Sequence, residues 1–160
     1  MREIDEVSFQ GRNAAAYWYR VRNPIRVLLN GLLMLLAKYF PSMIVKRNML
    51  RLVGVKIGKN VVIAPSTLDP IFPELIEIGE NSIIGWDSMI LTHEFVSNKL
   101  RKGKVRIGNN TTIGAKALIL PGVKIGNNVI VGAFSLVNKD VPDGMEVVGV
   151  PAEPLKSGQI

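Results

Sequence analysis

The chain of 160 residues contains a single histidine, His93, in the stretch ILTHEF at residues 90–95. A neutral imidazole can take a proton from a hydroxyl group, because its reference pKa of about 6.5 leaves it largely unprotonated at pH 7. Residues 96–106, VSNKLRKGKVR, follow at once and include five Lys or Arg and no acid. The histidine is either a general base or a structural residue. Independently, the basic stretch is either a flap that attracts an anionic ligand or a solvated surface loop.

The sequence contains no cysteine, which excludes disulfides, thiolate metal sites and cysteine nucleophiles, and fits a reducing compartment. The N-terminus, MREIDEVSF, lacks the charged start and early apolar run of a secretion signal. The apolar run from Ile25 to Ala37 is shorter than the roughly 20 residues that a membrane-spanning helix needs. We therefore expect a cytoplasmic protein that requires no metal.

An internal repeat shows which elements must position the histidine. The motifs IGKN, IGEN, IGNN and IGNN begin at residues 57, 78, 107 and 125, which indicates an 18-residue unit with insertions of three and eleven residues. Within the unit an aliphatic residue recurs every six positions, and a small or β-branched residue stands four positions after it. These second positions hold Val61, Thr67, Ser82, Ser88, Thr111, Ala117, Val123, Val129, Ser135 and Val141.

The six-residue step predicts a coil of short strands. Two positions that lie two residues apart in a strand point to the same face, so each hexad would turn one small and one aliphatic side chain inward. Three hexads per 18 residues make a three-sided coil, and stacked coils make a triangular parallel β-helix. His93 would lie at a corner of this β-helix, where the longer insertion leaves it.

The segments LTHEF, the basic stretch after it, IGNNTTIGAKALILPGVKIGNNVIVGAFSLVNKDVP and VVGVPAEPLK together resemble the hexapeptide-repeat acyltransferases, especially the maltose and galactoside O-acetyltransferase group. The resemblance runs from about Val55 to Lys156. It implies an all-β fold, a left-handed parallel β-helix of hexapeptide repeats, here with an N-terminal helical segment. It also implies a homotrimer, with acetyl-CoA as cosubstrate in the groove between neighbouring β-helices.

The resemblance further implies roles for individual residues. His93 would be the general base, and the backbone N–H of Ala115 would stabilise the oxyanion and contact CoA. Further CoA contacts are expected at Ala133, Asn138, Lys139 and Lys156. Positional candidates for contacts with the acceptor are Asp69, Trp86 and Glu94. Many family members have Trp in the position of Thr112, so we expect a different acceptor pocket.

Taken together, these features predict an acetyl-CoA-dependent O-acetyltransferase that acts directly on a sugar or glycan precursor. An N-acyltransferase for an amino sugar, and a non-catalytic trimeric scaffold that does not use His93, remain alternatives. The γ-type carbonic anhydrases share this fold but bind zinc through three histidines, a site that one histidine per chain cannot build in their manner. The net charge of +7 comes without any motif for nucleic-acid binding, so we expect no such partner.

The sequence divides into three segments: an N-terminal helical cap (1–54), a β-helix (55–141) with an inserted loop (96–106), and a C-terminal tail (142–160). The cap segment carries nine Lys or Arg against three acids. Residues 24–53 predict two helices, broken at Phe40 and Pro41. They are expected to cover the open end of the β-helix, and they could also contact an anionic membrane surface, which would favour a lipid-linked or cell-envelope glycan as acceptor.

Overall fold

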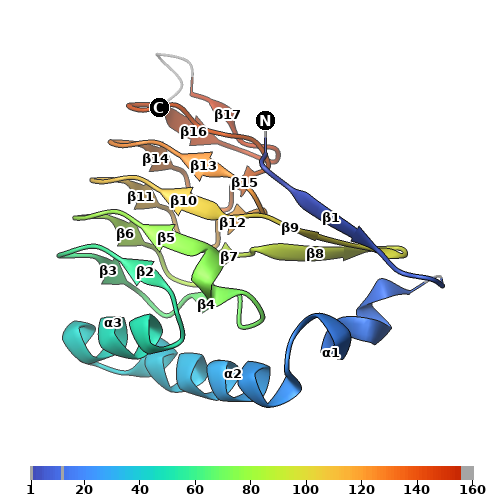
Figure 1. The fold of residues 1–160 in the computed structure, drawn as a ribbon. Helices are drawn as coiled ribbons and strands as arrows, with labels where there is room; N and C mark the ends of the chain where they lie inside the picture. Colours follow the sequence, from blue (N-terminus) through green and yellow to red (C-terminus); the bar gives the residue numbers. More distant parts are fainter. Residues whose placement is uncertain (1, 12, 156–160) are drawn as a thin grey trace.

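The computed structural model describes residues 2–11 and 13–155, which form a three-sided stack of short strands above two helices (Figure 1). Face 1 consists of β2 (Lys56–Ile57), β5 (Ile76–Ile78), β10 (Val105–Ile107) and β13 (Lys124–Ile125). Face 2 consists of β3 (Val62–Ile63), β6 (Ile83–Ile84), β11 (Thr112–Ile113), β14 (Ile130–Val131) and β16 (Glu146–Val148), with β17 (Glu153–Pro154) antiparallel at its edge. Face 3 consists of β4 (Thr67–Leu68), β7 (Met89–Ile90), β12 (Leu118–Ile119) and β15 (Leu136–Val137).

All the strands from β2 to β16 that belong to these faces pair in parallel with the coil before or after them. The predicted left-handed parallel β-helix of hexapeptide repeats is thereby confirmed. Its core contains the inward aliphatic residues, such as Ile84, Ile90, Ile113 and Ile119, none of which has any exposed surface. The stack continues beyond residue 141, the expected end of the β-helix, because β16 pairs with β14.

The corners explain the recurring Gly and Asn residues. A Cβ on Gly108 would lie 2.4 Å from the carbonyl oxygen of Gly126 in the next coil, so only glycine allows the coils to stack this closely. Asn110 has a φ of +53°, a left-handed conformation that Asn tolerates better than most residues. These positions are structural, as turn chemistry predicts.

The first coil departs from the expected phase. Ile63 and Leu68 pair with Ile84 and Ile90, so the corner between faces 2 and 3 has one residue fewer in this coil. As a result Ser66 points inward at 8% exposure, whereas Thr67, the residue expected there, is exposed. The net insertion of three residues therefore has two parts. Four residues are added at the corner between faces 3 and 1, and one is missing at the corner between faces 2 and 3.

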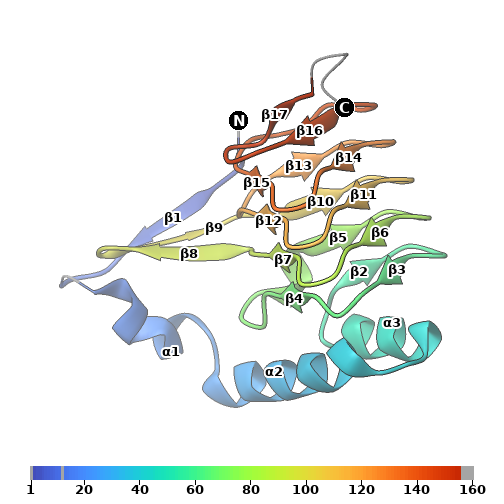
Figure 2. The same cartoon turned by 180° about the vertical axis from the view of Figure 1, so that it is seen from behind.

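The two N-terminal helices, α2 (Pro24–Tyr39) and α3 (Met43–Leu52), lie beneath the first coil and close its open end (Figures 1 and 2). Asn23 begins α2 by accepting a hydrogen bond from the N–H of Ile25, and proline follows it at the first helical position. Ala37 and Leu50 join the core of the β-helix. The helices thus extend the core below the strands of the first coil.

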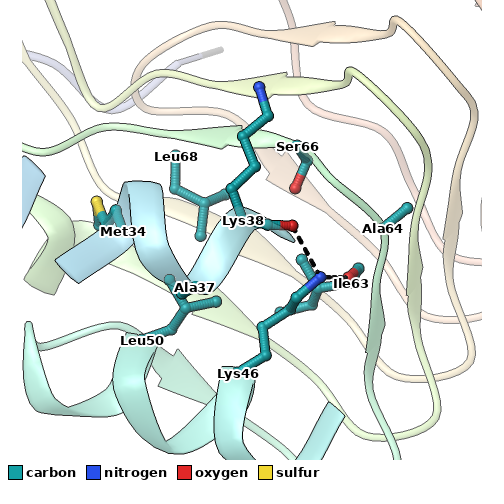
Figure 3. Close-up of a pocket in the computed structure, with 9 residues that line it drawn as sticks. All are labelled: Met34, Ala37, Lys38, Lys46, Leu50, Ile63, Ala64, Ser66 and Leu68. Atoms are coloured by element: carbon teal, nitrogen blue, oxygen red, sulfur yellow. Dashed lines mark hydrogen bonds between the residues drawn. The ribbon is translucent and has the colours of Figure 1, made fainter. Parts of the chain in front are cut away.

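Lys46 of α3 fastens this cap through a buried ammonium group that is 2% exposed. Its Nζ donates hydrogen bonds to the carbonyl oxygens of Lys38 (3.1 Å) and Ile63 (2.9 Å), which joins α3 to the end of α2 and to the first coil (Figure 3). Burial lowers the pKa of Lys46. The adjoining cavity of about 20 Å³ has room for about one water molecule, so it is no ligand site.

The eleven-residue insertion contributes to an ordered antiparallel sheet instead of a loose loop. The hairpin of β8 (His93–Val96) and β9 (Lys99–Lys102) pairs with β1 (Asp5–Ser8) from the N-terminal segment, and the short helices η1 (Ala14–Tyr17) and α1 (Trp18–Val21) follow β1. The third short helix, η2 (Pro73–Leu75), lies in the other insertion.

Four of the five cations of this insertion pair with acids, which reduces their attraction for an anionic ligand. Lys99 and Arg101 pair with Glu6, and Arg106 pairs with Glu3. Lys104 pairs with a face 1 glutamate, Glu77. The positive charge on which the flap alternative depends is therefore largely neutralised within the chain.

We expect Lys46→Met to lower the free energy of unfolding by about 1–3 kcal/mol, because two carbonyl oxygens at the cap would lose their donor. Urea denaturation at pH 7 measures this difference. Lys59→Met, the same change at an exposed position, serves as control and should alter stability by less than about 0.5 kcal/mol. Equal stabilities for the two variants would show that Lys46 does not fasten the cap.

Candidate active site

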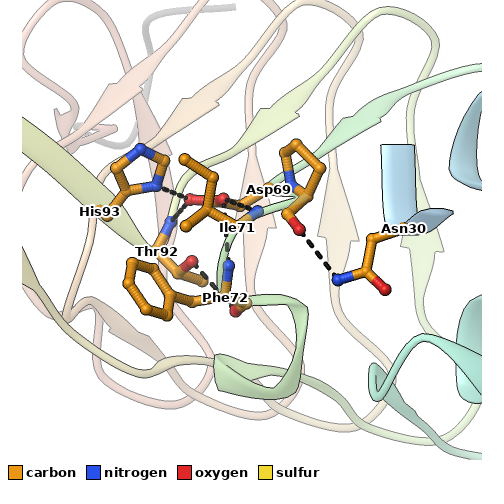
Figure 4. A network of polar contacts seen from close by, with 7 residues as sticks. Asn30, Asp69, Ile71, Phe72, Thr92 and His93 are labelled. Atoms are coloured by element: carbon orange, nitrogen blue, oxygen red, sulfur yellow. Dashed lines mark hydrogen bonds and ion pairs between the residues drawn. The ribbon is translucent and has the colours of Figure 1, made fainter. Parts of the chain in front are cut away.

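The best-formed polar site lies at the corner between faces 3 and 1, where both insertions leave the stack. Asp69 begins the shorter insertion directly after β4, and His93 begins the longer one shortly after β7, one coil higher. His93 Nδ1 contacts Asp69 Oδ2 (Figure 4). The Asp69 side chain is fully buried, whereas the His93 side chain is 16% exposed, so one group supports the other at the surface.

The backbone around Asp69 holds its carboxylate in place. Its Oδ1 accepts hydrogen bonds from the N–H groups of Ile71 (2.9 Å) and Phe72 (3.4 Å), and its Oδ2 accepts one from the N–H of Thr92 (3.0 Å). Burial alone would raise the pKa of Asp69, but the hydrogen bond and charge of His93, together with these N–H groups, outweigh it and hold the pKa below its ordinary value. The carboxylate is therefore ionised at neutral pH.

Two further contacts fix the loop that carries Asp69. The hydroxyl of Thr92 donates to the carbonyl oxygen of Phe72 (3.2 Å), and the side-chain amide of Asn30 in α2 donates to the carbonyl oxygen of Pro70 (3.1 Å) (Figure 4). The helical cap thus reaches the site through Asn30, whose side chain is buried.

Aromatic rings hold the imidazole from two sides. The ring of His93 meets those of Phe72 and Phe95 edge to face, with centroid distances of 5.7 Å and 5.3 Å. With Nδ1 bound to a carboxylate, the favoured neutral tautomer carries its proton on Nδ1 and leaves the Nε2 lone pair free. The arrangement can accept a proton at Nε2 and stabilise the imidazolium that results.

The residues expected to contact CoA gather on two corners, and Trp86, a candidate for acceptor contact, lies at the first of them. Trp86, Ala115 and Ala133 stack at the corner between faces 2 and 3: the carbonyl oxygen of Trp86 accepts from the N–H of Lys116 (2.8 Å), and that of Ala115 accepts from the N–H of Phe134 (2.9 Å). Within the part of the chain that the structure describes, the N–H of Ala115 has no backbone acceptor. It is free to donate to a ligand.

Asn138 and Lys139 lie instead at the corner of His93, directly after β15. The exposed ammonium group of Lys139 pairs with Glu153 (2.7 Å). Lys156, the remaining expected CoA contact, lies outside the described residues.

Of the three candidates for acceptor contacts, Asp69 and Glu94 point toward other residues of the chain, and Trp86 is exposed. Asp69 is buried and faces His93 instead of solvent. Glu94 follows His93 in β8, so its side chain points to the opposite side of the hairpin, where it lies 3.8 Å from Arg101 and 3.6 Å from Arg2. Trp86 is 57% exposed and keeps its surface position.

The His93 and Ala115 corners flank face 3 on opposite sides. About five residues of extended chain separate the two corners, which corresponds to roughly 15 Å at the usual strand rise. One chain therefore does not bring the imidazole and the Ala115 N–H to a common reacting atom. Within residues 2–11 and 13–155, no three His, Asp or Glu side chains come together as a metal site would require.

Sequence reasoning missed the pairing of Asp69 with His93 and the support from Thr92 and Asn30. A usable signal was present, because both insertions leave the repeat after the same face in successive coils. Asn30 also interrupts the apolar helix run. Its partner, the carbonyl of Pro70, comes from a loop 40 residues away and has no local signature.

Comparisons with known proteins agree with the architecture. Residues 104–139 match the family described as bacterial transferase hexapeptide (six repeats). The Bacillus subtilis protein named "Putative acetyltransferase YvoF" is 40% identical over 153 residues, which cover 94% of this chain and 89% of that protein. The Staphylococcus aureus protein named "Putative acetyltransferase SAR0816" is also 40% identical, over 94% of this chain and 95% of its own.

Solved structures share the fold at lower identity. The hexapeptide-repeat-containing acetyltransferase VCA0836 of Vibrio cholerae superposes with a TM-score of 0.66 at 21% identity, over 93% of this chain and 97% of that one. A galactoside acetyltransferase in complex with coenzyme A gives a TM-score of 0.65 at 24% identity, over 83% and 80% of the two chains. At these identities the likeness establishes the fold alone.

Asp69 should stabilise the folded protein in a pH-dependent way. Because its pKa is lower in the folded protein than its ordinary value of 3.8, its stabilisation is fully present above that pH and is lost as the pH falls through the folded-state pKa. We expect Asp69→Asn to lower the free energy of unfolding by about 2 kcal/mol at pH 7 and by progressively less below pH 3.8.

Urea denaturation of both proteins between neutral and acid pH measures this difference. Asp87→Asn is a matched control, since the Asp87 side chain is 44% exposed and its ion pairs with lysines are long. It should change stability by less than about 0.5 kcal/mol at any pH. A loss for Asp69→Asn that does not vary with pH would contradict the ionised, hydrogen-bonded carboxylate.

Proposed function

Since the chain belongs to the hexapeptide-repeat acetyltransferase family, we propose that it transfers an acetyl group from acetyl-CoA to a hydroxyl group of a sugar or glycan precursor. The observation that carries this proposal is the partly exposed imidazole of His93, whose Nδ1 contacts the buried carboxylate of Asp69. Relatives named as acetyltransferases, and similar folds solved with coenzyme A or acetyl-CoA, support the choice of cosubstrate. The maltose O-acetyltransferase of Clostridium difficile has the same fold and supports a sugar acceptor.

His93 Nε2 accepts the proton of the acceptor hydroxyl while the hydroxyl oxygen attacks the thioester carbonyl carbon. A C–O bond forms and the C–S bond breaks, and the imidazolium of His93 returns the proton to the departing CoA sulfur. Asp69 stabilises the imidazolium and keeps the ring oriented, so it acts as a positioning residue. The N–H of Ala115 donates to the carbonyl oxygen as negative charge develops on it.

A trimer would bring these groups together. Face 3 turns apolar side chains outward at Met89, Leu118 and Leu136. Face 2 also turns apolar side chains outward, at Val62, Ile83 and Ile130. Face 1 turns charged residues outward: Lys56, Glu77, Arg106 and Lys124. Of the two apolar faces, only face 3 lies between the His93 and Ala115 corners. We propose that three β-helices pack around an axis with face 3 inward. The His93 corner of one protomer then lies beside the Ala115 corner of the next.

This arrangement makes a groove between protomers that suits an extended cosubstrate. One wall contains the stacked corner of Ala115 and Ala133, and the other contains His93, Asn138 and Lys139. In this proposal the groove binds acetyl-CoA, with the thioester between His93 and Ala115. Every active site then uses two chains, which accounts for the separation of the two corners within one chain.

The direct test of the reaction is thiol release from acetyl-CoA in the presence of a pooled set of sugar acceptors. His93→Ala should lower turnover by about 10²–10⁴-fold, because no group would remove the hydroxyl proton. Trimer formation and CoA binding should remain unchanged in this variant. Unchanged turnover would remove His93 from the mechanism, and a wild-type protein that does not bind CoA would favour the scaffold alternative.

Ala115→Pro isolates the proposed oxyanion donor, because proline removes the N–H and little else. Gly114 to Ala117 form a turn in which Lys116 has a φ of +58°, and proline suits the position before such a residue. Pro65 already stands at the equivalent place in the first coil, where its carbonyl accepts from Asp87 N–H (2.8 Å). We expect turnover to fall about 10²–10³-fold, with Ala115→Ser, which keeps the N–H, as control.

Mixing the two inactive variants tests whether each site is shared between chains. In trimers reassembled from equal amounts of His93→Ala and Ala115→Pro protomers, roughly one site in four would pair an intact His93 with an intact neighbouring Ala115. Thiol release should therefore recover to about that fraction of the wild-type rate. Mixed trimers with no recovered activity would show that both groups act within one chain, or that Ala115 has another role.

A further inference from the structure

The outer side of α2 is apolar and has no partner within the described chain. Seven large side chains on this helix are between 54% and 72% exposed: Ile25, Leu28, Leu29, Leu32, Leu35, Leu36 and Tyr39. At 100° per residue they occupy the arc opposite Asn30 and Ala37, the residues that α2 buries against the β-helix. This apolar face of α2 therefore points away from the stack, at the end of the molecule. Monomeric soluble proteins rarely expose so large a contiguous apolar surface.

The same end of the molecule is strongly basic. From residue 7 to residue 68 the sequence contains ten Lys or Arg and not a single Asp or Glu. Arg26 is exposed in the first turn of α2. Acids from elsewhere in the described chain lie beside three of these cations: Glu74 pairs with Arg22, Asp87 pairs with Lys38, and Glu77 lies across from Lys56. An excess of positive charge remains at this end of the molecule.

The position of α2 limits what can cover it. The helix lies across the base of the stack, not along one of its three faces (Figure 2). A protomer that packs beside the β-helix would leave an outward face at the base open. A second molecule packed base to base would bring two surfaces with an excess of positive charge together, and their like charges would oppose association.

A flat anionic surface fits both properties of the base. No helix among the described residues is long and apolar enough to cross a membrane, and α2 has 16 residues. A helix with one apolar arc, an aromatic residue near its end and flanking cations lies in the plane of a lipid interface. We propose that the apolar face of α2 docks on the surface of an anionic lipid membrane.

Docking by one chain does not depend on the proposed acetyl transfer. If three chains pack around an axis parallel to the stack, their three α2 helices lie in one plane and face the same way. Each docked helix then raises the effective concentration of the other two at the surface, so the avidity exceeds that of a single helix.

Sedimentation with lipid vesicles tests the proposal on the whole protein. The wild type should pellet with phosphatidylcholine vesicles that contain roughly 30% phosphatidylglycerol, much less with pure phosphatidylcholine, and less again as salt increases. The double variant Leu28→Glu/Leu32→Glu should bind at least about tenfold more weakly, because it removes apolar surface and adds negative charge. Arg26→Gln should weaken binding only a few-fold.

Ile83→Glu provides the matched control, since Ile83 is 45% exposed on face 2, away from the base. It should bind vesicles as the wild type does. Far-UV circular dichroism and thiol release measured without lipid should be the same for wild type and the base variants, which separates this proposal from the catalytic one. Three results would overturn the proposal. The wild type could stay in the supernatant, or Leu28→Glu/Leu32→Glu could bind vesicles as well as the wild type does. Alternatively, the wild type could form dimers through α2 that this double variant abolishes, with no binding to lipid.

Discussion

The hydrogen bonding of each coil to the next is the constraint on which the rest of this structure depends. Strands as short as two residues are held only by pairing with the coil below and above, so the inward side chains must recur in phase. Ile57, Ile78, Ile107 and Ile125 stack in one column for this reason. Extra residues cannot remain within a face without shifting every later pair, and therefore they leave at the corners.

The site follows from where those extra residues leave. Two insertions emerge at the same corner in successive coils, and their first residues meet: a carboxylate from one and an imidazole from the other. A buried carboxylate is costly unless hydrogen bonds replace the lost water. Here three backbone N–H groups and the imidazole do so, and the turn that supplies two of them is itself fixed by Thr92 and Asn30. Rigidity at this corner thus comes from the stack below and from the helical cap.

Local periodicity made the β-helix, its corners and the cap helices predictable from the sequence, because each repeat carries its own pattern. The contacts between distant segments were not predictable in the same way. Nothing near Glu6 indicates that β1 will pair with the hairpin and neutralise Lys99 and Arg101. The phase of the first coil was also misread, because a four-residue insertion and a one-residue deletion give the same net length as three added residues, and so Ser66 takes the place expected for Thr67.

The two proposals bear on each other through geometry. His93 belongs to the second coil above α2, and coils rise by about 4.8 Å each, so a docked α2 would hold the imidazole roughly 15–20 Å above the lipid surface. A glycan of several sugar units on a membrane lipid would reach that height, and confinement to the surface raises its concentration at the groove. A freely soluble sugar gains nothing from a docked enzyme. If the α2 end of the molecule binds membrane, a lipid-linked glycan is favoured as the acceptor. If it does not, the lack of Asp and Glu from residue 7 to residue 68 and the exposed leucines of α2 have no physical explanation.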